Sequence, residues 1–157
     1  MKNKYKGIMS KKRVMIAGTF DIIHPGHIFL IDQAAKMGEV YVIVATDKNR
    51  EKYSGEPPIV PEEQRLEVIK HIKNVKEARL GREDNNTLKT VEEIDPDIIL
   101  LGPDQKYDIE ELKKGLEEMG LGNIKVTRLN EYYDKYELSS SSKIKERIVN
   151  RNKNGKK

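Results

Sequence analysis

The sequence predicts an α/β protein, a single Rossmann-like domain whose five-stranded parallel sheet carries helices on both faces. Apolar runs typical of strands alternate along the chain with amphipathic segments typical of helices, which is the pattern of parallel strands joined by crossover helices. The strongest apolar runs are nearly continuous, as strands that are buried on both faces require. With 157 residues, the chain has the length of one domain with a proper core.

The first half of the chain supplies two strands and two helices. The strands are expected over Val14–Ala17 and Val40–Ala45, because both runs are almost entirely apolar. The first helix is expected over Pro25–Met37. The charged segment Thr46–Val60 contains a glycine and a proline pair and predicts a long loop. Pro61 then suits the first position of the second helix, and two glutamates follow it in the first turn.

The second half continues the alternation and ends on a helix that follows a run of serines suited to capping. Three more strands are expected over Val75–Leu80, Asp97–Leu101 and Ile124–Leu129, of which the first has the weakest pattern. The expected helices cover Leu88–Ile94, Ile109–Met119 and Ser140–Asn150.

Composition and charge narrow the class of protein. The chain has no cysteine, which excludes disulfides, thiolate nucleophiles and cysteine-ligated metals. No apolar run approaches membrane-spanning length and the N-terminus is not signal-like, so we expect no membrane association and a cytoplasmic location. Residues 1–13 carry six Lys/Arg and no acid, and residues 143–157 carry seven with one acid. The two ends therefore contribute +12 and residues 14–142 carry −8. We expect solvated basic ends, a flexible tail over residues 150–157, and no nucleic-acid partner.

The segment Gly18–His27 contains the strongest functional pattern. It follows a strand and opens a helix, with Pro25 and Gly26 between His24 and His27. A helix start offers unpaired N–H groups and a positive dipole end to a phosphate, and two imidazoles add donors. Gly26 is expected to let a phosphate oxygen approach without meeting a Cβ. The segment is neither a Walker A loop nor a dinucleotide fingerprint, and two histidines alone make a weak metal site. The segment therefore indicates a binding site for a nucleoside triphosphate.

The segment resembles the signature of the nucleotidyltransferase superfamily whose hallmark is His-x-Gly-His. The second motif of that superfamily, Ile-Ser-Ser/Thr-Thr-x-Ile-Lys/Arg, is matched by Ser139–Lys145 with serine in place of the first isoleucine. The resemblance covers residues 13–149, and residues 1–12 form a basic N-terminal extension. It implies that an acceptor phosphate attacks the α-phosphate of the nucleotide and that pyrophosphate leaves. It further implies a divalent metal ion, Mg²⁺, that arrives with the nucleotide rather than at a protein motif.

The resemblance also assigns roles to individual residues. His24 and His27 would be catalytic and donate to the triphosphate, and Ser141 and Ser142 would hold its β- and γ-phosphates. A plain N-cap is the alternative for the serines. The nucleotide-binding positions implied are Thr19, Phe20, His24, Pro25, Gly26, His27, Asp104, Tyr132, Ser141 and Ser142.

The cationic residues outside the two motifs have two open interpretations. Lys48, Arg50 and Lys52 lie in the expected long loop, where they either close over the phosphates as a lid or are simply solvated. Arg65 ends the run Pro61–Arg65, at the place where related cytidylyltransferases have an active-site arginine. It is either such a residue or an ordinary exposed helix residue. In the first case, replacing Arg65 with alanine is expected to reduce turnover far more than stability.

The runs Leu101–Gln105 and Pro61–Arg65 resemble the archaeal-type FAD synthases, which transfer AMP from ATP to FMN. In that group Asp104 would face the nucleotide and Tyr132 the adenine or its ribose. The alternatives are that Asp104 caps a loop and that Tyr132 packs with its neighbouring tyrosines. Family members are often dimers, so a homodimer is a further possibility.

Other functions stay open at this point. A glycerol-3-phosphate cytidylyltransferase would use CTP, but such enzymes tend to have Arg-Thr-x-Gly where this chain has residues 135–138. A sugar-phosphate adenylyltransferase shares the same phosphate motifs. A protein without catalysis, which binds a nucleotide or uses its basic tail to bind nucleic acid, is the alternative from another class.

Overall fold

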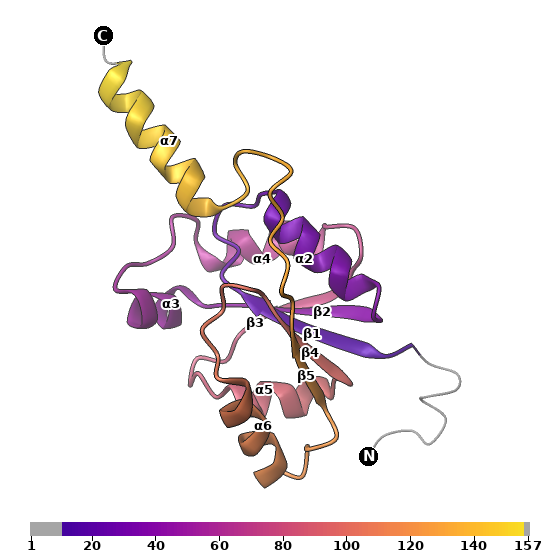
Figure 1. Cartoon of the computed structure of the whole chain (residues 1–157). Helices are drawn as coiled ribbons and strands as arrows, with labels where there is room; N and C mark the ends of the chain where they lie inside the picture. The colour runs from indigo at the N-terminus through magenta and orange to yellow at the C-terminus, as the bar shows by residue number, and fades with distance from the viewer. Residues whose placement is uncertain (1–10, 156–157) are drawn as a thin grey trace.

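The computed structural model describes residues 11–155 and contains one sheet of five parallel strands (Figure 1). Its strands are β1 (Arg13–Gly18), β2 (Glu39–Val44), β3 (Val75–Leu80), β4 (Ile98–Leu101) and β5 (Lys125–Arg128). They lie in the order β3–β2–β1–β4–β5, so β1 pairs with both β2 and β4. The chain leaves β1 toward one edge and returns to its other side. This reversal puts a ligand-binding crevice at the carboxyl ends of the central strands.

Helices cover both faces of this sheet. The described helices are α2 (Pro25–Ala35), α3 (Asp47–Ser54), α4 (Glu62–Lys70), α5 (Thr87–Ile94), α6 (Ile109–Glu118) and α7 (Ser141–Asn154). In Figure 1, α2 and α4 lie on one side of the strands and α5 and α6 on the other, while α7 projects from the body. The predicted fold class is therefore confirmed.

Two hydrophobic clusters, one on each face, explain the continuous apolar strands. On one face Ile16 packs with Ile31 of α2 and Ile69 of α4, and all three are fully buried. On the other face Met15 belongs to the cluster that contains Leu116 of α6. Successive residues of a strand point to opposite faces, so both must be apolar where both faces are covered.

The expected loop Thr46–Val60 is wrong in its first part, because α3 occupies Asp47–Ser54. The Thr46 side chain caps this helix by accepting a hydrogen bond from the Asn49 N–H at 3.2 Å, and Gly55 ends it in the left-handed region with φ 91°. None of its residues is buried. The sequence therefore carries no apolar periodicity that would have revealed it.

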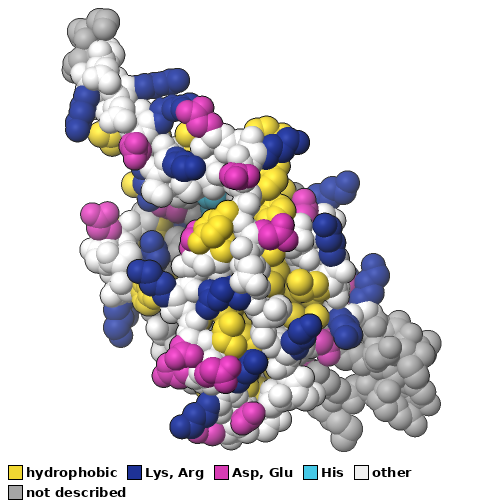
Figure 2. Space-filling model, in the orientation of Figure 1, with side chains coloured by type: hydrophobic (Ala, Val, Ile, Leu, Met, Phe, Trp, Pro, Cys, Tyr) yellow, Lys and Arg dark blue, Asp and Glu magenta, His cyan; other side chains and the backbone are white. Residues whose placement is uncertain are grey.

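The expected flexible tail is also wrong in part, because α7 continues as a helix to Asn154. None of its residues is buried, and Figure 2 shows Lys and Arg side chains along the projecting helix. Most of the expected N-terminal extension and the last two residues lie outside the described part of the chain. Between residues 11 and 155, no helix combines the length and the apolar character that crossing a membrane requires.

Candidate active site

The two histidines of the signature lie against each other at the start of α2. His24 is the N-cap, and its Nδ1 accepts a hydrogen bond from the Gly26 N–H at 3.1 Å. Its ring stacks on that of His27, with 3.7 Å between the centroids and 28° between the planes. Because Nδ1 of His24 is an acceptor, the neutral ring carries its proton on Nε2. That Nε2–H is a donor for an incoming anion.

The backbone donors expected at this helix start are occupied. Pro25 has no N–H, and the Gly26 N–H is capped by the His24 ring. The N–H groups of His27 and Ile28 both donate to the His24 carbonyl, at 3.0 and 3.4 Å. The imidazoles, rather than the backbone, are thus the donors that this end of α2 offers, and the helix dipole adds a favourable field.

Both histidines are neutral near pH 7. Burial lowers the pKa of His24. Burial, together with the neighbouring His24, lowers the pKa of His27 to about 3, although the Asp21 carboxylate acts in the opposite direction. The Nδ1 of His27 is buried and has no hydrogen-bond partner within residues 11–155. A neutral pair can stack closely, and each ring can still donate one hydrogen bond.

The ring of Phe20 completes the histidine cluster. It is buried, lies 5.2 Å from the His27 ring between centroids, and sits on a backbone with φ 54°. A Cβ on Gly18 would lie 3.0 Å from this ring, so glycine at 18 makes room for the aromatic side chain. Phe20 therefore contributes the wall behind His27 in addition to any backbone contact.

The two signature motifs, more than a hundred residues apart, meet beside Gly26. A Cβ at Gly26 would lie 2.7 Å from the Ser139 carbonyl oxygen, and the Ser141 hydroxyl donates to the Ile22 carbonyl at 3.2 Å. The space beside Gly26 is thus filled by the Ser139 backbone and is not left for a phosphate oxygen, which corrects the expectation. The glycine is needed for contact between the motifs.

The serines before and at the start of α7 make different contacts. Ser140, not Ser141 or Ser142, is the N-cap of α7 and accepts from the Lys143 N–H at 3.2 Å. Ser141 uses its hydroxyl on the Ile22 carbonyl, while Ser142 is exposed at the helix start. The first N–H groups of a helix have no partner within the helix. Those of Ser141 and Ser142 therefore remain suited to phosphate oxygens.

Asp21 connects the signature loop to two other segments. Its buried carboxylate accepts hydrogen bonds from the Ile59 and Val60 N–H groups, at 3.0 and 2.8 Å, and pairs with Lys145 at 3.1 Å. Burial alone would raise the pKa of Asp21, but these three contacts outweigh it and hold the pKa below its usual value. An ionised Asp21 thus fixes α7 and the segment before α4 to the histidine loop.

The interpretation of Arg65 as an ordinary exposed helix residue is wrong. Arg65 is 1% exposed. Its guanidinium donates to the carbonyls of Thr19, Ala45 and Val60 and to the Asp47 carboxylate, all at 2.7–2.8 Å. Arg65 therefore joins the loops after β1 and β2, and replacing it should cost stability as well as activity.

Asp104 and Tyr132 come together beyond β4 and β5. The Asp104 carboxylate accepts from the Tyr132 hydroxyl and raises the pKa of that tyrosine. Both side chains are exposed. Tyr133 instead stacks on Phe29 of α2 and contacts Tyr136, so the packing interpretation describes these two tyrosines and not Tyr132.

A cavity of about 770 Å³ lies at the carboxyl ends of β1, β2, β3 and β4. Gly18 and Thr19 of the signature loop line it, but His24 and His27 do not. Arg50 of α3 lines it, whereas Lys48 is exposed on the same helix and does not. Its polar and aromatic lining also includes Thr19, Asn49, Tyr53, Arg82, Asn86, Asp104 and Tyr107.

Sequence reasoning named Thr19, Arg50 and Asp104 of this lining and missed most of the rest. Tyr53 belongs to the helix that has no apolar face, and Arg82 and Asn86 follow the weakest strand. The signal that could have found them is topological, because residues directly after neighbouring parallel strands meet at one edge of the sheet.

Comparison with known proteins agrees with this arrangement. Residues 15–147 match the model of the cytidylyltransferase-like family. An FAD synthase of Methanobrevibacter smithii is 47% identical and aligns over 92% of this chain and 95% of its own length, and one of Pyrococcus horikoshii is 44% identical over 88% and 93%.

A solved structure from Thermoplasma volcanium, described as a lipopolysaccharide core biosynthesis protein, superposes with a TM-score of 0.74. It is 41% identical, over 79% of this chain and 99% of its own. With its two signature motifs in contact at the end of the central strand, the chain belongs to the cytidylyltransferase-like family and, within it, to the family of the FAD synthases.

Proposed function

We propose that this protein is an FAD synthase, which transfers AMP from ATP to FMN and releases pyrophosphate. The observation that carries this proposal is the similarity to FAD synthases over almost the full length of both chains. The geometry of the site supports the chemistry independently, because two neutral histidines and the start of α7 converge at the end of β1.

The reaction needs no protein nucleophile. An oxygen of the FMN phosphate forms a bond to the α-phosphorus of ATP, and the bond from that phosphorus to the oxygen bridging to the β-phosphate breaks. The Nε2–H groups of His24 and His27 donate to the phosphate oxygens on which charge develops. The hydrogen bond from the Gly26 N–H holds the His24 ring, and contacts with the rings of His24 and Phe20 hold His27, so little reorganisation is required.

The remaining predicted residues are proposed to orient ATP around this centre. The N–H groups of Ser141 and Ser142 would hold the β- and γ-phosphates at the start of α7, where Lys145 adds a positive charge. Asp104 and Tyr132 would contact the adenosine. Thr19, Phe20 and Pro25 would lie against the phosphate site, and Gly26 would serve it by allowing the two motifs to meet.

A divalent cation would enter with the triphosphate. Within the described chain, no three His, Asp or Glu side chains are grouped so that they could hold a metal ion. Mg²⁺ bound to the phosphates would neutralise charge on the leaving pyrophosphate. We further propose a transferase domain over residues 13–149 with basic extensions at 1–12 and 150–157. We also propose a cytoplasmic location and a homodimer, because members of the family are often dimers.

The test is pyrophosphate release with ATP or CTP and Mg²⁺ against FMN, glycerol 3-phosphate and a panel of sugar phosphates. We expect release with ATP and FMN alone, and FAD as the product by chromatography. Activity with CTP and glycerol 3-phosphate would contradict the proposal. Activity with ATP and a sugar phosphate would favour the second candidate, a sugar-phosphate adenylyltransferase, which shares the same phosphate motifs.

A further inference from the structure

Two tyrosines line the cavity from different segments, and neither has a role in the core. Tyr53 of α3 is 72% exposed and Tyr107, in the segment between β4 and α6, is 41% exposed. We infer that Tyr53 and Tyr107 bind the flat ring system of the acceptor and make this site selective for an aromatic acceptor. The inference rests on the proposed function and names the side chains that would recognise its substrate.

The helix that carries Tyr53 faces the cavity instead of the core. Its residues Asn49, Arg50, Tyr53 and Ser54 all line the cavity, and none of its eight residues is buried. Positions i, i+1, i+4 and i+5 form one face of a helix. The face of α3 formed by these four residues is therefore turned to the cavity, and no residue of the helix packs in the core. An aromatic side chain left exposed on such a face is suited to a ligand rather than to packing.

The two tyrosines lie on either side of the central strand. Strand β1 is between β2 and β4, α3 follows β2, and the segment with Tyr107 follows β4. Both supports are anchored. The Asn49 side chain donates to the Arg82 carbonyl at 2.9 Å, and Arg128 donates to the Tyr107 carbonyl at 2.6 Å. The backbones are fixed while the rings stay free to stack on a ligand.

The direction of attack places the acceptor in this cavity. In an in-line transfer the acceptor oxygen approaches the α-phosphorus opposite the leaving pyrophosphate. The start of α7, where the pyrophosphate is proposed to lie, packs beside Gly26 of α2. The cavity is lined by residues of β1 and β2 and of the segments that follow β1, β2, β3 and β4, and no residue of α2 or α7 lines it, so it lies away from that contact. Asp104, which is proposed to contact the adenosine, lies at one part of the lining, and the volume of about 770 Å³ leaves room for an aromatic acceptor beside it.

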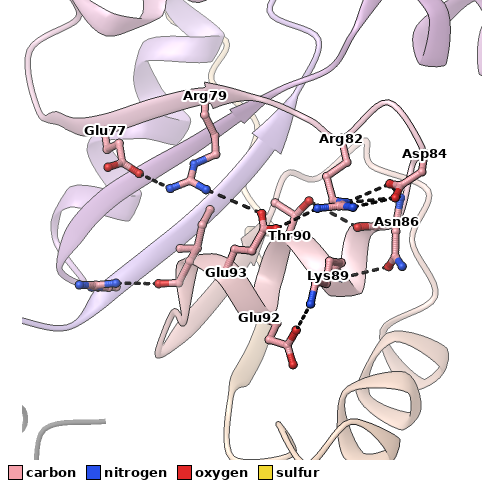
Figure 3. Close-up of polar contacts among 11 residues, drawn as sticks. Glu77, Arg79, Arg82, Asp84, Asn86, Lys89, Thr90, Glu92 and Glu93 are labelled. Carbon is pink, nitrogen blue, oxygen red and sulfur yellow. Dashed lines mark hydrogen bonds and ion pairs between the residues drawn. The ribbon is translucent and has the colours of Figure 1, made fainter. Parts of the chain in front are cut away.

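The charges of the lining fit an acceptor that carries a phosphate. Arg82 is held by Asp84 and Glu93, with contacts of 2.8 Å to each carboxylate (Figure 3), so its charge is neutralised locally. Among residues 11–155, by contrast, no carboxylate forms an ion pair with Arg50. Arg50 therefore remains a cation available to the acceptor, one helical turn from Tyr53.

The experiment compares Tyr53→Ala and Tyr107→Ala with Tyr136→Ala, an exposed tyrosine outside the cavity. Two quantities are measured, the KM values for FMN and ATP and the quenching of FMN fluorescence on binding without ATP. We expect each cavity variant to weaken FMN binding and raise its KM roughly tenfold, since stacking on one aromatic ring is worth about that much. The KM for ATP should not change, and Tyr53→Phe and Tyr107→Phe should restore FMN binding.

Charge is tested in the same way. Arg50→Met should raise the KM for FMN, whereas Lys52→Met, which removes the same charge from an exposed position on α3 outside the cavity lining, should not. Unchanged FMN binding in both tyrosine variants, or a rise in the KM for ATP in place of that for FMN, would overturn the inference. Failure of the unaltered protein to form FAD would instead overturn the proposed function, so the two outcomes are distinguishable.

Discussion

Two regions at the carboxyl end of the sheet differ in how many of their polar groups are already bonded within the protein. The histidine side consists of the signature loop with its partners Arg65 and Lys145, and the cavity side consists of α3 and the segment with Tyr107. On the histidine side, most polar groups already have protein partners. His24 caps α2, Asp21 accepts two hydrogen bonds and pairs with Lys145, and Arg65 is buried among three carbonyls and a carboxylate. On the side of the cavity, Arg50 forms no ion pair with a described carboxylate and Tyr53 is largely exposed.

This difference separates two physical tasks. Stabilising charge at the α-phosphate requires donors that are fixed before the substrate arrives, because reorganisation would reduce their effect. Choosing an acceptor requires side chains that have no partner until the acceptor binds. We expect the histidine side to serve transfer in general and the cavity side to decide what receives the nucleotide.

The largest expected effect concerns Arg65. Arg65→Met would leave Asp47 unpaired and three carbonyls without their donor. We expect it to lower the free energy of unfolding by about 3–5 kcal/mol, because each of the three carbonyls left without a donor costs about 1–3 kcal/mol, whereas the partly exposed Asp47 can be solvated. Urea denaturation measures this. Arg79→Met is the control, since its ion pairs with Glu77 and Glu93 are exposed and worth little. Equal stability of the two variants would show that the hydrogen bonds of Arg65 do not hold the histidine side together.

His27→Ala tests what this rigidity serves. It removes one donor to the developing charge, and we expect kcat to fall about a hundred- to a thousandfold. FMN binding, followed by its fluorescence, should remain, because the acceptor side is untouched. His71→Ala, at an exposed position that ends α4, provides the control. Loss of FMN binding together with kcat would show that the two sides are not separate.

The pH dependence of stability gives a smaller effect. The pKa of His27 falls from 6.5 to about 3 on folding, so between these values the unfolded chain binds a proton that the folded chain does not. The free energy of unfolding is therefore not reduced by this group above pH 6.5, and it falls as the pH drops from 6.5 toward 3. From pH 6.5 to 5 the loss is roughly 2 kcal/mol. The unfolding free energy of His27→Gln should decline less over this range, while His71→Gln should decline like the unaltered protein. If the unfolding free energy of His27→Gln fell as steeply with decreasing pH as that of the unaltered protein, another group would be responsible for the pH dependence.

The smallest effect is expected from the projecting end of α7. Removing residues 152–157 leaves both sides of the active site intact, so the KM values and kcat should stay unchanged. The same truncation tests whether the basic end binds nucleic acid. We expect RNA binding by the intact protein to be weak, and a tight interaction with a steep dependence on salt that vanishes on truncation would contradict this. Loss of turnover with retained ATP binding would instead tie the tail to catalysis.

Much of the fold was determined by local pattern. The strand Val75–Leu80 was placed correctly despite its weak pattern, and the continuous apolar runs predicted a sheet covered on both faces. The functional signature was equally local, because His24, Pro25, Gly26 and His27 are adjacent in the chain. Their stacking and capping follow from that short spacing.

Contacts between distant residues were decided only by the tertiary structure. Nothing near Arg65 in the sequence shows that its partners lie 46 and 20 residues away, and so its burial could not be predicted. The role of Gly26 changed for the same reason, since its neighbour is the backbone of Ser139. The sequence determined which elements form and that phosphate chemistry takes place at the end of β1. The tertiary structure decided which polar groups are already satisfied there and which are left for a ligand, because that depends on partners from other strands.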